Sequence, residues 1–383
     1  MKKERNLFSN KIVSEIKKIL IFGILVIFFT FLFAQLISAI FQKASFFSIT
    51  SWERWDTIHY LFIAKEGYKT EGEERLKIVF LPFYPFTIKV FAFFFRDYLF
   101  SALFVSNLAF IFVLIFLYKI VAKNFSKNIA KRTILYLTIF PTAYFFHAGY
   151  TESLFLLLVL LSFYFAKEKK WIISSFFGFL ATLTRINGIV LFPVLFFEYL
   201  LQKNVDFKKI DFEILSIFLV PFGFLIYLLI NYSLFGNPFQ FSIFLKNHWF
   251  KKFTWPIEGL KGVTSHIKYY MAHKKEWDFS TRIHEFTISW AELIFPLFAL
   301  FLIFLGFFYL PASYSFYSLL NWLGFVSTSF WLSLPRYLLS IFPIFIVFAI
   351  LGEKKIFNFI LIPVFLFFRF LFLFRFIRGF WAF

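Results

Sequence analysis

Apolar residues dominate long runs of the chain, and short polar segments separate these runs. The first run extends from Ile19 to Phe41, and a helix needs about 20 such residues to cross a bilayer. Several later runs are shorter, so we expect them to be tilted or paired with a neighbour. They cover residues 98–118, 133–148, 152–166, 171–185, 188–201, 214–235, 290–310, 312–332, 337–351 and 356–374. The pattern predicts an all-α polytopic membrane protein with about eleven transmembrane helices.

The composition supports this class and excludes others. Hydrophobic residues make up 61% of the 383 residues, and the mean hydropathy is +0.78, so the chain has more apolar surface than a soluble core can bury. Cysteine is absent, which excludes disulfides, thiolate metal sites and cysteine nucleophiles. The net charge of +19 is divided among short loops, so it indicates membrane orientation and no nucleic-acid partner.

The basic loops predict the topology. Nearly half of the 40 Lys and Arg residues lie in five short segments, 1–18, 119–132, 167–170, 203–209 and 353–355. All five are cytoplasmic if the N-terminus is cytoplasmic and residues 78–95 do not cross the membrane. Pro82, Pro85 and Lys89 favour an interfacial helix for that segment. The first apolar run is too long for a signal-peptide core and no small-residue cleavage site follows it, so we expect it to be retained.

This topology makes residues 1–383 a single integral membrane domain. We expect a cytoplasmic N-terminus (1–18), a first outer loop with interfacial helices (42–97), a helical core (98–235), a second outer loop (236–289) and C-terminal helices (290–383). The expected location is the plasma membrane of a prokaryote, with the unusual polar residues on the outer face. The second outer loop carries Trp249, Trp255 and Trp277 among lysines, and it either covers the substrates or rests on anionic headgroups.

The first polar motif is SWERWD, residues 51–56. On one helix, Trp52, Trp55, His59 and Phe62 would form a stripe at headgroup level, with Asp56 on a neighbouring face. Asp56 is then either a solvated residue of an anchor helix or a reactive carboxylate at the membrane surface.

A second motif, FPTAYFFHAGYTESLF, covers residues 140–155. We expect Gly149 to break one helix and Thr151 to cap the next, which places Glu152 in a first turn, where the helix dipole favours an acid. The alternative is that Tyr150 and Glu152 meet Asp56 in a shared pocket.

Two further motifs place arginines beside breaks between apolar runs. They are LTRING with Arg185 and Asn187, and LPRY with Arg336 after Pro335. An arginine at this depth needs a partner or a water-filled cavity. Either it extends to headgroup phosphates, or it binds the phosphate of a lipid-linked donor.

Six motifs occur in one order: RWD with IAKEGY, FLPFYP, FPTAYFFHAGYTESLF, LTRINGI, FGNPFQF with Trp255-Pro256, and PRYLLSIFPIF. This succession resembles the PIG-V family of mannosyltransferases over residues 52–350. The resemblance implies the GT-C architecture, in which an acidic residue of a long first outer loop is catalytic. Where that family usually has PYSES and LTRPTG, this chain has GYTES and LTRING, which keeps the polar residues and puts the acceptor specificity in doubt.

The resemblance implies transfer of a sugar, usually mannose, from a polyprenyl-phosphate (dolichyl-phosphate) carrier to a hydroxyl acceptor on the non-cytoplasmic face. Because the phosphate is already a good leaving group, no nucleotide site is needed, and no P-loop is present. Asp56 is then the general base of an inverting displacement. The expected substrate-binding residues are Arg54, Trp55, His59, Tyr60, Tyr84, Tyr150, Glu152, Arg185, Asn187, Arg336 and Tyr337. No cofactor and no metal site are predicted, because the histidines lack paired ligand spacing.

Other classes remain open at this stage. A lipid or glycan transporter would place ionisable residues near the bilayer midplane and show repeat symmetry, whereas here they gather near helix ends. A same-fold transferase with another polyprenyl-phosphate sugar has the same sequence features, and a non-catalytic scaffold is disfavoured by the presence of Asp56. The acceptor can be a glycolipid, a polymer or a protein side chain.

Overall fold

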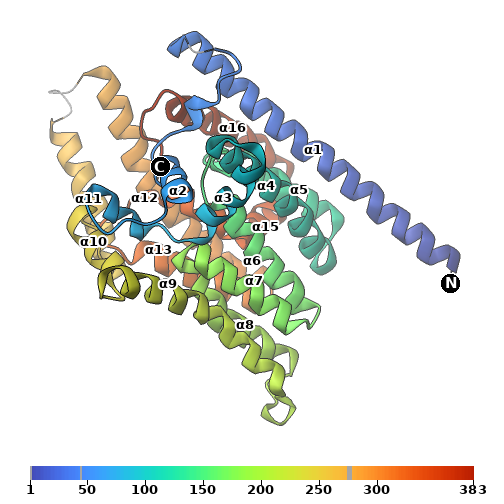
Figure 1. Cartoon of the computed structure of the whole chain (residues 1–383). Helices are drawn as coiled ribbons and strands as arrows, with labels where there is room; N and C mark the ends of the chain where they lie inside the picture. The colour runs from blue at the N-terminus through green and yellow to red at the C-terminus, as the bar shows by residue number, and fades with distance from the viewer. Residues whose placement is uncertain (1, 44, 274–277) are drawn as a thin grey trace.

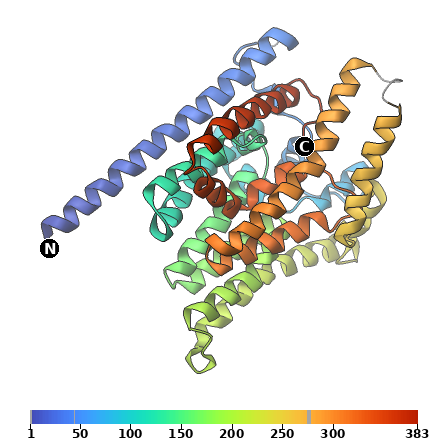
Figure 2. The ribbon, with the colours of Figure 1, turned by 180° about the vertical axis from the view of Figure 1, so that it is seen from behind.

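The structure is a computed structural model that describes residues 2–43, 45–273 and 278–383. Within these ranges the chain is helical without strands, and one isolated β-bridge joins Phe253 and Thr328. The all-α prediction is therefore confirmed for the described residues. A long first helix lies along one side of the bundle, and the last helix runs beside it (Figures 1 and 2).

In the described part of the chain, five helical segments are long and apolar enough to cross a membrane, and a multi-pass membrane protein follows from them. They are Val13–Gln42, Tyr98–Asn124, Phe212–Phe235, Glu285–Tyr309 and Lys355–Ile377. Two bent helix pairs raise the number to seven if each pair is one span. The predicted count of eleven is not confirmed, because many of the remaining apolar helices are shorter than a bilayer is thick.

The described elements follow one another in short connections. The first third of the chain holds α1 (Lys2–Gln42), η1 (Thr50–Trp52), α2 (Asp56–Glu66), η2 (Glu73–Val79) and α3 (Phe83–Phe95). The middle holds α4 (Tyr98–Asn124), α5 (Lys127–Ile139), η3 (Ala143–Phe146), α6 (Glu152–Lys167), α7 (Trp171–Thr184), η4 (Ile186–Val190), α8 (Leu191–Gln202), η5 (Phe207–Lys209), η6 (Phe212–Phe218) and α9 (Leu219–Phe235). The last third holds α10 (Gln240–His248), α11 (Pro256–His273), α12 (Phe279–Tyr309), α13 (Ala312–Val326), α14 (Leu334–Tyr337), η7 (Leu338–Ser340), α15 (Phe342–Leu351) and α16 (Lys355–Ile377).

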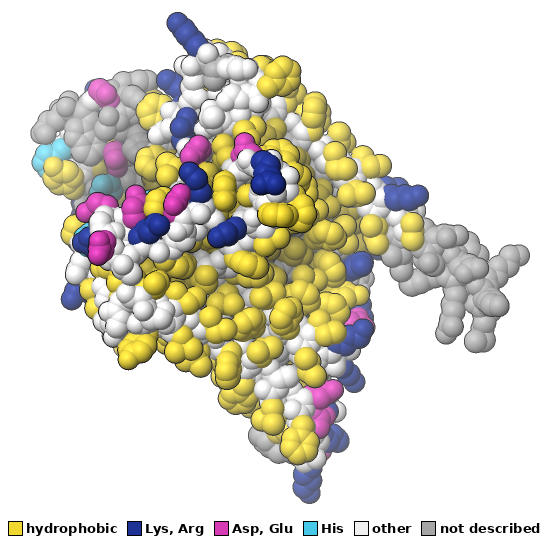
Figure 3. Space-filling view, viewed as in Figure 1, with side chains coloured by type: hydrophobic (Ala, Val, Ile, Leu, Met, Phe, Trp, Pro, Cys, Tyr) yellow, Lys and Arg dark blue, Asp and Glu magenta, His cyan; other side chains and the backbone are white. Residues whose placement is uncertain are grey.

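Ion pairs join the basic segments at one end of the bundle. Lys131 contacts Glu15 of α1 at 2.8 Å, and Lys123 contacts Glu168 at 2.7 Å. Arg132 reaches Glu353 at 3.4 Å. These contacts bring segments 1–18, 119–132, 167–170 and 353–355 together. Which side of the membrane this end faces stays a prediction. In Figure 3, charged side chains gather toward opposite ends of the molecule, with a broad apolar field between them.

The segment predicted to be the first outer loop folds into short helices between α1 and α4. Its predicted bounds, 42–97, agree with the end of α1 and the start of α4, where the Asp97 carboxylate accepts a hydrogen bond from the Phe100 N–H at 2.8 Å. Helices η2 and α3 meet at 108°, so residues 73–95 do not form one straight span. The loop therefore folds back toward the bundle and presents α2 to the core helices.

A close backbone approach positions the break after α7. A Cβ on Gly188 would lie 2.3 Å from the backbone nitrogen of Thr182, so only glycine lets η4 turn back against α7. Arg185 sits at this break with an extended backbone, after the last residue of α7. The LTRING motif therefore directs Arg185 away from its own helix.

Candidate active site

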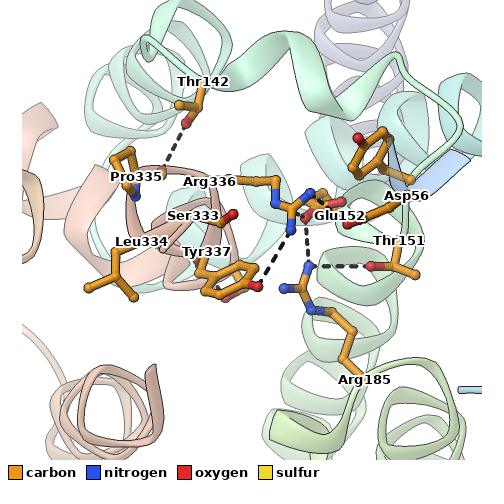
Figure 4. Close-up of polar contacts among 12 residues, drawn as sticks. Asp56, Thr142, Thr151, Glu152, Arg185, Ser333, Leu334, Pro335, Arg336 and Tyr337 are labelled. Carbon is orange, nitrogen blue, oxygen red and sulfur yellow. Dashed lines mark hydrogen bonds and ion pairs between the residues drawn. The ribbon is translucent and has the colours of Figure 1, made fainter. Parts of the chain in front are cut away.

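The site is built around a buried guanidinium. Arg336 of α14 lies between two carboxylates, its Nη1 2.8 Å from Asp56 Oδ2 and its Nε 3.4 Å from Glu152 Oε1. Asp56 opens α2 and Glu152 opens α6, so three segments far apart in sequence meet at Arg336 (Figure 4). Side-chain exposures of 6% for Arg336 and 3% for Glu152, against 26% for Asp56, leave the Asp56 carboxylate open to solvent.

A second arginine, Arg185, completes a cluster of four charged side chains, which are Asp56, Glu152, Arg185 and Arg336. Arg185 donates from Nη1 to Glu152 Oε1 at 2.7 Å and to Thr151 Oγ1 at 3.3 Å. Thr151 occupies the N-cap position of α6 and Glu152 lies in the first turn, as predicted, but the Thr151 side chain makes no capping hydrogen bond and accepts one from Arg185 instead. Oε2 of Glu152 is buried without a hydrogen-bond partner among the described residues.

The backbone before Asp56 is strained. Trp55 has φ 49° and ψ −119°, a conformation that side chains other than glycine rarely adopt. The C-terminal segment supports this turn: the ring of Trp381 lies 5.1 Å from that of Trp55, and Arg54 donates to the Ile377 carbonyl at 3.4 Å. The turn directs Asp56 toward Arg336.

The predicted tryptophan stripe is therefore wrong. Trp52 belongs to η1 and not to α2, since the helix begins only at Asp56. Trp52 is fully buried between Phe31 and Phe376, whereas Trp55 is 39% exposed. The strained turn separates the two tryptophans, so they share no helical face.

Gly149 allows α2 to approach the segment before α6. A Cβ at this position would lie 2.8 Å from Thr57 Cγ2 and 3.3 Å from Ala102 Cβ. The expectation that Gly149 itself breaks a helix is also wrong, because α5 already ends at Ile139, before Pro141. Gly149 instead provides the space that lets Asp56 and Glu152 reach one arginine.

A buried carboxylate that the sequence reasoning missed holds the Arg336 loop. Glu292 of α12 accepts hydrogen bonds from the backbone N–H groups of Ser333 and Leu334, the latter at 2.9 Å. Ser333 has φ 67° and leads directly into α14. The sequence feature that could have identified Glu292 is that it is an acidic residue within the apolar run of residues 290–310. Glu292 thereby fixes the direction in which Arg336 leaves the loop.

The aromatic candidates surround the cluster at different depths. Tyr337 lies closest: its ring centroid is 4.9 Å from the Arg185 guanidinium and 5.1 Å from that of Arg336. Tyr150 lies 5.1 Å from Arg336 and donates from its hydroxyl to the Arg54 carbonyl at 3.3 Å. Both rings are therefore in the cluster, as predicted.

Tyr60 and Tyr84 lie behind the cluster. Their rings meet at 5.1 Å, and the Tyr84 hydroxyl pairs with Ser106 Oγ at 2.8 Å, a bond that fastens α3 to α4. The structure thus gives Tyr84 a packing role, and only Tyr60, one helical turn after Asp56, borders the site.

His59 does not pair with Asp56. Its ring stacks on Phe80 at 4.7 Å, and its Nδ1 is buried without a partner among the described residues. Burial lowers the pKa of His59 from its usual value; the Asp56 carboxylate opposes this effect and Lys77 adds to it. His59 is therefore a neutral neighbour of the carboxylate near pH 7.

Asn187 does not join the cluster in the described structure. The Asn187 amide packs against Gly324 of α13, where a Cβ would lie only 2.8 Å from Nδ2. Trp277 lies outside the described residues. Lys251, which the sequence reasoning missed, reaches the cluster instead, with Nζ 5.4 Å from the centre of the Tyr337 ring. The only sequence feature that could have pointed to Lys251 is its position in the lysine-rich loop of residues 236–289.

The chemistry of the cluster is that of anion binding beside a carboxylate. Among the described residues, no group of three or more His, Cys, Asp or Glu side chains is arranged to hold a metal ion. Arg185 uses one nitrogen for Glu152 and Thr151, so the rest of its guanidinium is available to a ligand. Asp56 keeps Oδ1 without a hydrogen bond to a described residue.

A helical multi-pass protein with an acid and arginine cluster at its loops fits the class of membrane-embedded transferases. The family model described as Mannosyltransferase (PIG-V) matches residues 29–241, more than half of the chain. The chain therefore belongs to the PIG-V mannosyltransferase family, and it is a membrane glycosyltransferase with a sugar donor and an acceptor. The match includes Asp56, Glu152 and Arg185 and ends before Arg336. A search of the curated proteins finds no match.

The buried pair of Arg185 and Glu152 predicts strong energetic coupling. In a double-mutant cycle with Arg185→Gln and Glu152→Gln, we expect a coupling energy of about 1–3 kcal/mol, because each single change removes the shortest ion pair of a buried charge. The measurement is the free energy of unfolding of the purified protein in detergent.

The matched control for this cycle is the exposed pair Lys123 and Glu168, whose side chains are 58% and 37% exposed. We expect less than about 1 kcal/mol there, because solvent screens the charges. Equal coupling in the two pairs would contradict the structural role of the Arg185 and Glu152 contact.

Proposed function

We propose that the protein transfers a mannosyl residue from a polyprenyl-phosphate carrier to a hydroxyl acceptor at the outer membrane surface. The observation that carries this proposal is a partly open carboxylate, Asp56, held beside two arginines at the meeting point of three loops. A lipid phosphate ester needs this combination: a cation for the leaving phosphate and a base for the acceptor.

The proposed reaction is a single displacement at the anomeric carbon. The acceptor oxygen forms a bond to C1 of the sugar while the bond between C1 and the phosphate oxygen breaks, and its electron pair stays on the phosphate. Asp56 takes the acceptor proton through the free oxygen Oδ1. The phosphate gains one negative charge, which Arg185 and Arg336 stabilise, and this differential stabilisation lowers the barrier.

Glu152 is proposed to serve two purposes. Oε1 contacts both arginines and keeps their guanidinium groups oriented. The guanidinium nitrogens that face away from Glu152 stay available to the phosphate. Oε2, buried and unpaired, accepts a hydrogen bond from a hydroxyl of the sugar or the acceptor. Because such a buried acceptor discriminates strongly against ligands without a matching hydroxyl, Glu152 is a candidate for sugar selectivity.

An apolar cavity near the loop that carries Arg336 supports the proposal of a lipid-linked donor. Its volume is about 650 Å³, and its lining comes from α12, α15, α16 and residues 140–141, with Leu338 two residues beyond Arg336. Along α12 the lining extends from Phe286 to Leu302, sixteen residues or about 24 Å at 1.5 Å per residue. A cavity of this length along a membrane-spanning helix suits an isoprenoid chain whose phosphate lies in the cluster.

The first test of the proposal is Asp56→Asn. We expect transfer of radiolabelled mannose from polyprenyl-phosphate-mannose to membrane acceptors to fall by about 100- to 10,000-fold, the range for loss of a general base. The control is Glu53→Gln, because Glu53 lies in the same turn and makes no ion pair with a described residue. Transfer that is equal in wild type and Asp56→Asn at matched expression overturns the role of Asp56.

The second test concerns the cavity and uses Ala299→Phe, which places a ring among its lining residues. Displacing two or three donor carbons at about 0.8 kcal/mol each predicts a roughly 15- to 60-fold higher KM for a long-chain donor. A donor with one or two isoprene units does not fill the cavity, so its KM stays unchanged.

The control is Leu297→Phe, on the exposed side of the same helix and outside the cavity lining. Thermal unfolding of both variants checks that the packing is intact. A change in KM that is the same for long and short donors contradicts a chain-binding role for the cavity.

A further inference from the structure

A strap from the second outer loop is fastened over the cluster. Residues 250–254 run beside residues 327–329, where the Ser329 N–H donates to the Lys252 carbonyl at 3.0 Å and the Thr254 N–H donates to the Ser327 carbonyl at 3.1 Å. The Ser329 hydroxyl adds a bond to the Phe250 carbonyl at 3.0 Å. These bonds fix the backbone on both sides of Lys251.

The strap brings Lys251 to the ring that both arginines already face. Its Nζ lies 5.4 Å from the Tyr337 centroid, beside Arg185 at 4.9 Å and Arg336 at 5.1 Å. Three cations thus surround one phenol. Electrostatic repulsion among them costs free energy unless anions compensate it.

None of the carboxylates near the site forms a direct ion pair with Lys251. Asp56 and Glu152 pair with the two arginines, and the Glu292 carboxylate is occupied by two backbone N–H groups. No carboxylate of a described residue forms an ion pair with Lys251. Lys251 is therefore the cation of this group that no carboxylate of a described residue contacts directly, although Glu292 lies within its electrostatic reach, and it lies at the edge that the strap covers.

We propose that Lys251 is a phosphate-binding residue, which contacts the donor phosphate together with the free edge of Arg185 above the Tyr337 ring. This inference rests on the proposed lipid-phosphate donor and adds a binding group from the second outer loop. The donor diester carries one negative charge and the leaving monoester carries two, so Lys251 stabilises the departing phosphate more than the bound donor. The strap thereby links donor binding to catalysis.

A lipid headgroup phosphate presents similar chemistry, and the position of Lys251 argues against it as the partner. Nζ faces Tyr337, whose side chain is in contact with both buried arginines, whereas Lys252, the next residue, is exposed. Lys252 is therefore the matched control, since it shares the strap and the charge without the contact to Tyr337.

The test compares Lys251→Gln, Lys251→Arg and Lys252→Gln in purified full-length protein. For Lys251→Gln we expect a loss of about 10- to 100-fold in kcat/KM for polyprenyl-phosphate-mannose, the usual effect of losing a charge-assisted hydrogen bond. Lys251→Arg restores most of this activity, and Lys252→Gln changes it less than about 2-fold.

A binding measurement with sugar-free polyprenyl phosphate separates this inference from the proposed function. We expect wild type to bind this ligand, and Lys251→Gln to bind it about 10-fold more weakly with a smaller dependence on salt. Equal binding by wild type and Lys251→Gln overturns the role of Lys251 alone. Equal losses in Lys251→Gln and Lys252→Gln that follow the anionic lipid content assign both lysines to headgroups. Wild type that does not bind the ligand overturns the donor class as well.

Discussion

The structure of the site depends on one buried cation, the guanidinium of Arg336. Its side chain is 6% exposed and is balanced by Asp56 from α2 and Glu152 from α6. An unpaired charge at this depth would be strongly unfavourable, so the first outer loop, the start of α6 and the α14 loop must dock together in the folded protein. The same requirement that joins the three segments also places a carboxylate, two arginines and a partly open space side by side.

The supports of this pairing are steric as well as electrostatic. Glu292 fixes the backbone before Arg336, and the close approach at Gly149 lets α2 reach the start of α6. The C-terminal segment braces the strained turn at Trp55, so that Asp56 is directed inward. These contacts come from the segment before α6, from α12 and from the residues after α16, all far in sequence from Asp56. The geometry of the candidate site is thus a property of the whole bundle.

Sequence reasoning predicted the helical class and the membrane character, and it singled out several residues that the structure brings together, because these features depend on local composition and on motifs. Asp56, Tyr150, Glu152, Arg185, Arg336 and Tyr337 do meet in one cluster. The sequence did not predict which acid pairs with which arginine, since that depends on long-range docking. It also missed Glu292 and Lys251: the first is a lone acid in an apolar run, and the second is one lysine among many. The tryptophan stripe failed because a strained turn, invisible in periodicity, interrupts the helix.

The central claim is that Asp56 and the arginines act in a single displacement at the anomeric carbon. The stereochemistry of the product tests this claim most directly, because one displacement inverts the anomeric carbon and a covalent sugar–enzyme intermediate retains its configuration. The measurement is the NMR assignment of the anomeric linkage in the product formed from a donor of defined configuration. The account predicts the opposite configuration in the product. A product with the configuration of the donor would contradict it.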